Sequence, residues 1–132
     1  MIADDQRAIT AVLIRYATGI DRRDWQLFAS CFAEGCSADY PGFGLWHGPA
    51  EITDFMAAAH APLGPTLHRM TNFTIQITGD TATAQSYVDA LLMPGTAGGD
   101  VHRAAGWYDD RLVRTADGWR ISHRRFNAVH IS

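Results

Sequence analysis

The hydrophobic period of this chain changes at Thr66, and this change limits its possible folds more than any other feature. Before Thr66, apolar residues recur every three or four positions, which is the spacing of one face of a helix. After Thr66, apolar and polar residues alternate, which is typical of β-strands. The sequence therefore predicts an α+β fold, with helices in the first half and strands in the second.

The first helical stretch has a clear core face that ends at an acid. This face is formed by Ile9, Val12, Leu13, Tyr16, Ala17 and Ile20. Asp4 and Asp5 are predicted to cap the helix, which should end at Ile20 or Asp21. Because a carboxylate beside a buried helix edge is costly without a partner, we expect Asp21 to meet a residue from later in the chain.

Two more helices are predicted before the change of period. Residues 24–33 should form a short helix that packs back on the first, and Gly35 should end it in the left-handed conformation. A third helix is expected to begin at Gly48, because Pro49 then occupies the first helical positions, and to end before Pro62.

The strands are predicted as two long hairpins. Residues 66–78 and 81–93 form the first, and residues 101–114 and 119–131 form the second around an Asp-Gly turn pair. A brief strand is expected at residues 37–40. Together, three N-terminal helices should pack in a strongly curved, mostly antiparallel sheet that forms a cone with an interior pocket, as one domain over the whole chain.

Strict alternation in the first long strand leads to a conflict. It puts His68 and Asn72 on one face of the sheet, and Phe73 and Ile75 on the other. Either both faces are covered, the second by another subunit, or a bulge changes the parity. We therefore expect a homodimer or homotrimer formed through the sheet.

Composition excludes several classes of function. The net charge is -3, and the eleven basic residues, all arginine, are scattered, which disfavours nucleic-acid binding. No lysine is present for Schiff-base chemistry, and no apolar run suits a signal peptide or membrane span, so we expect a cytoplasmic protein that does not bind membranes. Cys31 and Cys36 form no disulfide or CxxC pattern and should be buried.

Proton transfer is the chemistry that the remaining residues support. Five histidines are too dispersed for a metal site, so neither a metal nor another cofactor is expected: His47, His60, His102, His123 and His130. A histidine supported by an aspartate is a natural base at neutral pH, and it could remove a proton next to a carbonyl group. Tyr16, Tyr40 and Asn72 are candidate donors to the oxyanion that would form. Four Trp and ten Phe and Tyr residues suit a pocket for a small apolar or aromatic molecule.

Three segments carry a family resemblance: YATGIDRRDW, GPTLHRMTNFTIQITGDTA and GWYDDRLVRTADGWRI. With the order of elements, they resemble the SnoaL-like branch of the nuclear transport factor 2 superfamily, particularly scytalone dehydratase and hexachlorocyclohexane dehydrochlorinase. The resemblance implies a catalytic pair of Asp21 and His68. It also implies that Tyr40 polarises a substrate carbonyl. This chain departs from the dehydratase at two positions. Ile20 stands where the dehydratase has a second tyrosine, and no histidine lies near Met93, where the dehydratase has a second catalytic histidine.

The resemblance implies a cofactor-independent lyase or isomerase that acts on a small cyclic or aromatic carbonyl compound. Catalysis would fall to Asp21, His68, Tyr16 and Tyr40. Substrate-binding residues are expected to be Asn72, Trp46, Phe43, Phe55, Met93 and Trp107.

Other interpretations remain open. Asp21 could instead cap the helix that begins at Asp24, or pair with Arg22 or Arg23, and Asn72 could instead stabilise a strand bulge. A ketosteroid-isomerase-like enzyme would use Asp39 as the base. A non-catalytic module would use the pocket to bind a hydrophobic ligand or to support assembly.

Overall fold

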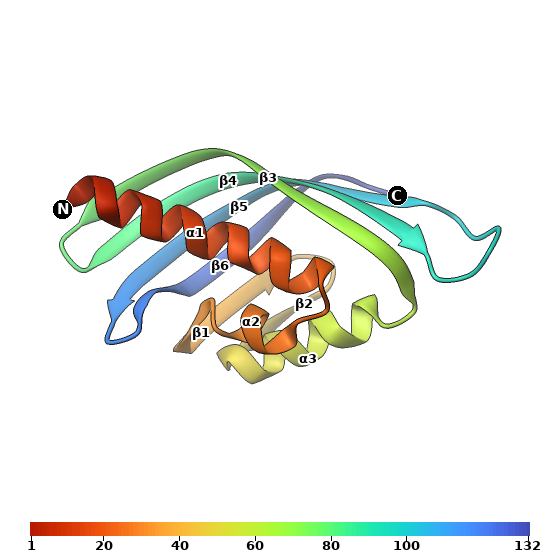
Figure 1. The fold of residues 1–132 in the computed structure, drawn as a ribbon, viewed down its shortest axis with the longest axis horizontal. Helices are drawn as coiled ribbons and strands as arrows, with labels where there is room; N and C mark the ends of the chain where they lie inside the picture. The colour runs from red at the N-terminus through yellow and green to blue at the C-terminus, as the bar shows by residue number, and fades with distance from the viewer.

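Helix α1 (Ile2–Asp21) crosses one face of a six-stranded sheet in the computed structural model, which describes residues 1–132 (Figure 1). All six residues of its predicted apolar face are buried, and the helix ends at Asp21 as expected. The predicted cap is wrong, because the helix begins before Asp4 and no side chain caps it. Asp5 instead binds Arg114 and the indole N–H of Trp119, which fixes the start of α1 to the second long hairpin.

The sheet has the order β2-β1-β6-β5-β4-β3, and it is open, with β2 and β3 at its two edges. Its strands are β1 (Phe32–Tyr40), β2 (Gly44–His47), β3 (Leu63–Thr78), β4 (Thr81–Pro94), β5 (His102–Thr115) and β6 (Gly118–Ile131). All neighbours are antiparallel except β1 and β6, which run parallel. The α+β class and the two long hairpins are confirmed.

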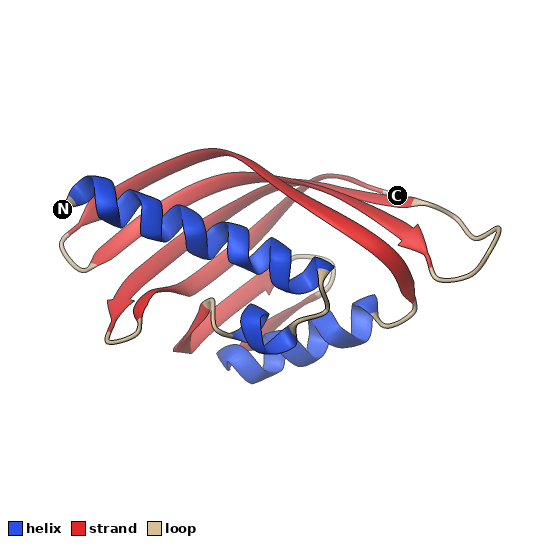
Figure 2. Ribbon diagram, in the orientation of Figure 1, coloured by secondary structure: helices blue, strands red, loops and turns tan.

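The first half of the chain differs from the expectation. The second helix, α2 (Trp25–Ala29), is shorter than predicted, because Phe32 already begins β1 and Gly35 lies within that strand. Helix α3 (Gly48–His60) begins at the predicted residue but follows β1 and β2, so the three helices do not form one N-terminal block (Figure 2). The sequence missed β2 because its four residues pair only with β1, a partner that local pattern does not reveal.

A β-bulge resolves the conflict of parity in β3. The register with β4 shifts between Thr71 and Thr74, and Asn72 has a φ of 55°, in the left-handed region. Beyond the bulge, Phe73 and Ile75 pack against the same core as Met70. The bulge was one of the two open alternatives, so the parity of β3 requires no second subunit.

The opposite face of the sheet carries exposed aromatic and aliphatic side chains. Tyr87 and Trp107 lie directly opposite each other on β4 and β5, and Val129 on β6 is nearby. Cys31 and Cys36 are buried free thiols, as expected. None of the helices is long and apolar enough to cross a membrane.

Gly19 allows the close approach of α1 and α2 that sets the position of Asp21. A Cβ atom at residue 19 would lie 2.8 Å from the backbone nitrogen of Phe28 and 2.9 Å from its Cα. We expect Gly19→Ala to lower the free energy of unfolding by about 1–3 kcal/mol, because the backbone of α2 would have to move. Urea denaturation measures this loss. Gly35→Ala is the control, since a Cβ there has no neighbour within 4 Å, and equal losses in both variants would contradict the explanation.

Candidate active site

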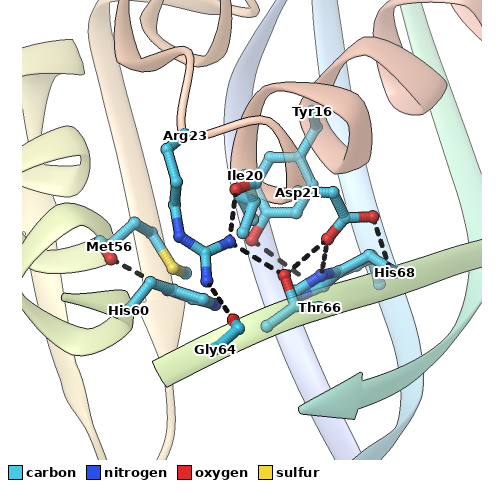
Figure 3. Close-up of polar contacts among 10 residues, drawn as sticks. Tyr16, Ile20, Asp21, Arg23, Met56, His60, Gly64, Thr66 and His68 are labelled. Atoms are coloured by element: carbon cyan, nitrogen blue, oxygen red, sulfur yellow. Dashed lines mark hydrogen bonds and ion pairs between the residues drawn. The ribbon is translucent and has the colours of Figure 1, made fainter. Parts of the chain in front are cut away.

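Asp21 and His68 meet where the end of α1 contacts the first half of β3 (Figure 3). The Nδ1 atom of His68 lies 2.7 Å from Asp21 Oδ1, and the backbone N–H of His68 donates to Asp21 Oδ2 at 2.7 Å. Since a carboxylate only accepts, Nδ1 carries the proton, and Nε2 of the neutral ring has a free lone pair. The predicted pair therefore forms, in the geometry that orients a histidine base.

Thr66 and Arg23 complete the environment of the Asp21 carboxylate. The Thr66 hydroxyl donates to Asp21 Oδ1 at 2.9 Å, and Arg23 donates to the same hydroxyl oxygen at 2.9 Å. Arg23 also donates to the carbonyl groups of Ile20 and Gly64, at 2.8 and 2.7 Å. Although burial works in the opposite direction, the hydrogen bonds from His68 and Thr66 keep the pKa of Asp21 below its usual value. Asp21 thus remains an anion at neutral pH.

This role of Arg23 was not predicted from the sequence. Arg23 was expected only as an alternative ion-pair partner of Asp21, whereas its guanidinium binds the Thr66 hydroxyl and two backbone carbonyl groups. Its backbone has a φ of 55°, which is unusual for a residue other than glycine. This conformation directs the side chain toward β3, and no local sequence pattern predicts it.

His68 lines an apolar cavity of about 250 Å³ beside the dyad. The cavity wall has sixteen residues, and only His60 and His68 among them are not hydrophobic or aromatic. Four other residues that were predicted to belong to the site also line it: Tyr16, Tyr40, Phe43 and Phe55. No three His, Cys, Asp or Glu side chains are grouped in a way that would hold a metal ion.

Three tyrosine hydroxyl groups gather in the wall of the cavity. The hydroxyl oxygens of Tyr16 and Tyr40 are 2.5 Å apart, and Tyr108 donates to Tyr16 at 3.4 Å. Burial raises the pKa of all three phenols well above the usual value, so they remain protonated donors at neutral pH. Tyr108 was not predicted, although it lies on the inward-facing side of an alternating strand.

Arg124 lies behind these phenols as a fully buried cation. Its guanidinium is 3.7 Å from the ring centroid of Tyr108 and 4.2 Å from that of Tyr16. Asp110 accepts two hydrogen bonds from it, both of 2.8 Å, and both side chains have no exposed surface. Although burial opposes it, the Asp110 carboxylate holds the pKa of Arg124 well above its usual value. The sequence analysis did not identify this pair, because burial depends on strand pairing.

Four predicted substrate-binding residues do not line the cavity. Asn72 is exposed because it occupies the β-bulge, which was the alternative interpretation of that residue. Trp107 lies on the opposite face of the sheet, next to inward-facing Tyr108. Met93 follows the lining residue Leu92 and so faces the other way.

Trp46 supports the cavity from behind rather than lining it. It stacks on Phe55 at a centroid distance of 3.9 Å, and it packs edge to face against Tyr40 at 5.9 Å. Asp39, the alternative base, alternates with the inward-facing Tyr40 and forms an ion pair with Arg125 at 2.9 Å. It is not part of the cavity wall.

Comparison with protein families identifies this architecture. The model of the SnoaL-like domain matches residues 1–125. The chain belongs to the SnoaL-like domain family. An uncharacterized relative, Rv2910c from Mycobacterium tuberculosis, is 29% identical over 124 residues, which are 91% of this chain and 82% of the relative.

Several solved structures share the fold. One is provisionally named a scytalone dehydratase, from Novosphingobium aromaticivorans. It has a TM-score of 0.90 and 20% identity, over 98% of this chain and 87% of the other. A hexachlorocyclohexane dehydrochlorinase, LinA type 2, has a TM-score of 0.89 and 20% identity, over 98% of this chain and 88% of the other. At these identities the two structures establish the fold alone.

The buried ion pair gives a prediction about stability. We expect Asp110→Asn to lower the free energy of unfolding by about 3–5 kcal/mol, because the cation of Arg124 would remain buried without a countercharge. Asp109→Asn, at the neighbouring residue on the partly exposed opposite face, should cost less than about 1 kcal/mol. Thermal and urea unfolding measure both losses. A loss below about 1 kcal/mol in Asp110→Asn would show that the pair is not needed.

Proposed function

We propose that this SnoaL-like protein is a cofactor-independent lyase or isomerase that acts on a small cyclic or aromatic carbonyl compound. The observation that carries the proposal is the Asp21–His68 pair at the wall of an apolar cavity. A histidine whose Nδ1–H is held by a carboxylate presents Nε2 as a base, and the carboxylate stabilises the imidazolium that forms when the base takes a proton.

The proposed reaction begins at a carbon next to the substrate carbonyl. His68 Nε2 takes the proton, and the C–H electron pair moves into the carbonyl group to form an enolate. The phenol cluster donates a hydrogen bond to the enolate oxygen, in a site whose wall is largely apolar. If a neighbouring carbon carries a leaving group, its departure completes an elimination. If not, return of the proton to another carbon completes an isomerisation.

Tyr40 and Tyr16 are the proposed donors to the enolate oxygen. Their short hydroxyl contact lets one phenol donate to the other, which leaves the second O–H free to point at a ligand. Tyr108 extends this chain, and the Arg124 cation against two of the rings favours the partial negative charge that donation creates. The names of the two fold neighbours, a dehydratase and a dehydrochlorinase, agree with an elimination.

Deuterium uptake tests the proposal without knowledge of the natural substrate. A panel of small cyclic and aromatic ketones is incubated with the protein in deuterated water, and NMR measures exchange of the protons next to the carbonyl. We expect His68→Ala to lower the exchange rate by about 10²- to 10⁴-fold, because the other histidine of the wall, His60, has a lowered pKa and no carboxylate bonded to its ring. Asp21→Asn should also lower it strongly, since the amide cannot stabilise the imidazolium.

His123→Ala is the matched control. His123 is a partly buried strand histidine that bonds Ser37 at 2.6 Å, outside the cavity wall. Its loss should leave exchange unchanged. Full deuterium exchange in His68→Ala would show that His68 is not the base. If exchange were also lost in Asp39→Asn, this would favour the ketosteroid-isomerase-like alternative. Ligands that raise the melting temperature but exchange no protons would indicate a binding module instead.

A further inference from the structure

His60 is a second histidine of the cavity wall, and the proposed base does not account for it. It ends helix α3, it is 7% exposed, and its ring centroid lies 5.6 Å from that of His68. Of the sixteen lining residues, only these two histidines present ring nitrogen atoms to an otherwise apolar and phenolic space. The sequence analysis set His60 aside as one of several dispersed histidines.

The hydrogen bond of His60 fixes which nitrogen is available. Its Nδ1 atom lies 2.8 Å from the carbonyl oxygen of Met56, and a carbonyl oxygen only accepts (Figure 3). Nδ1 therefore carries the proton, and Nε2 of the neutral ring has a free lone pair. No protein atom donates to this nitrogen, and His60 is one of the residues that line the cavity.

The surroundings keep His60 neutral. Burial lowers its pKa, and the positive charge of Arg23 acts in the same direction. The Met56 carbonyl and the Asp21 carboxylate oppose this shift only in part. Proton uptake by His68 during the proposed reaction would put a further positive charge beside His60. Its Nε2 atom therefore remains an acceptor while His68 is the group that takes the proton.

We propose that His60 is a specificity residue that accepts a hydrogen bond from a hydroxyl group of the ligand. The carbonyl group of this ligand would bind the phenol cluster, which supplies donors, and its hydroxyl group would bind Nε2 of His60. The ligand class is then a hydroxylated carbonyl compound rather than a purely apolar one. A lone pair left without a donor in an apolar cavity disfavours ligands that lack the hydroxyl group. This inference rests on the proposed function for the carbonyl group, but its test does not require turnover.

Binding of matched ligands to wild-type protein is the first test. The probes are acetophenone, its three hydroxy isomers and the corresponding methoxy compounds, and calorimetry or NMR titration gives each dissociation constant. We expect one hydroxy isomer to bind about 3- to 10-fold more tightly than acetophenone, which corresponds to one hydrogen bond. The methoxy compound of the same geometry should show no gain, because it has no proton to donate. Equal affinities for all the probes would overturn the proposal.

Two substitutions separate the role of His60 as a hydrogen-bond acceptor from its structural bond to Met56. His60→Phe and His60→Gln both lose the bond to Met56, but only glutamine places an oxygen acceptor near the former Nε2. In His60→Phe, the hydroxy isomer should bind about as tightly as acetophenone. In His60→Gln, its tighter binding should return in part. A preference that persists in His60→Phe would overturn the proposal. Circular dichroism and the affinity for acetophenone show whether each variant is folded.

The two proposals fail in different ways. Loss of deuterium exchange in every ketone, with the hydroxyl preference intact, would remove the catalytic function and keep the role of His60. Normal exchange without any hydroxyl preference would do the reverse. A direct readout is the ¹⁵N resonance of His60 Nε2, which should shift when the hydroxy isomer binds and not when acetophenone binds.

Discussion

The carboxylate of Asp21 joins the helical half of this protein to its sheet. It receives one hydrogen bond from the backbone of His68, one from its ring and one from Thr66. The same contacts that fix the end of α1 on β3 also fix the tautomer of the histidine. Because one group serves both purposes, the position of His68 is determined by the packing of α1 on β3 and not by a flexible loop.

The site separates charge from the space that receives a ligand. Asp21, Arg23, Asp110 and Arg124 all carry charge near the cavity, yet none of them lines it. Asp21 contacts the cavity-lining imidazole of His68, and Arg124 contacts the rings of Tyr16 and Tyr108. Arg23 and Asp110 lie one contact further away, against Thr66 and Arg124. An apolar wall strengthens the hydrogen bonds made beside it, because the local dielectric constant is lower than in water. The proposed proton transfer would take place beside these neutral groups.

Much of this architecture could be predicted from residue patterns. The apolar face of α1, the start of α3 and both long hairpins follow from period and turn chemistry, which are local properties. The pairing of Asp21 with His68 was predicted too, although it rested on family resemblance more than on period. Asn72, Met93 and Trp107 were predicted to line the cavity and do not, because one bulge or one step of alternation moves a side chain to the other face of the sheet.

The sequence by itself determined the class of the fold, the buried face of α1 and the need for a partner at Asp21, since each depends on residues that are near in the chain. Only the tertiary structure decided the composition of the site. Tyr108, Arg124 and His60 come from β5, β6 and α3, and their distances to Tyr16 and His68 depend on strand order and on the left-handed turn at Arg23. Such long-range contacts leave no periodic trace in the sequence, because burial and proximity arise only when the strands pair and α1 closes over them.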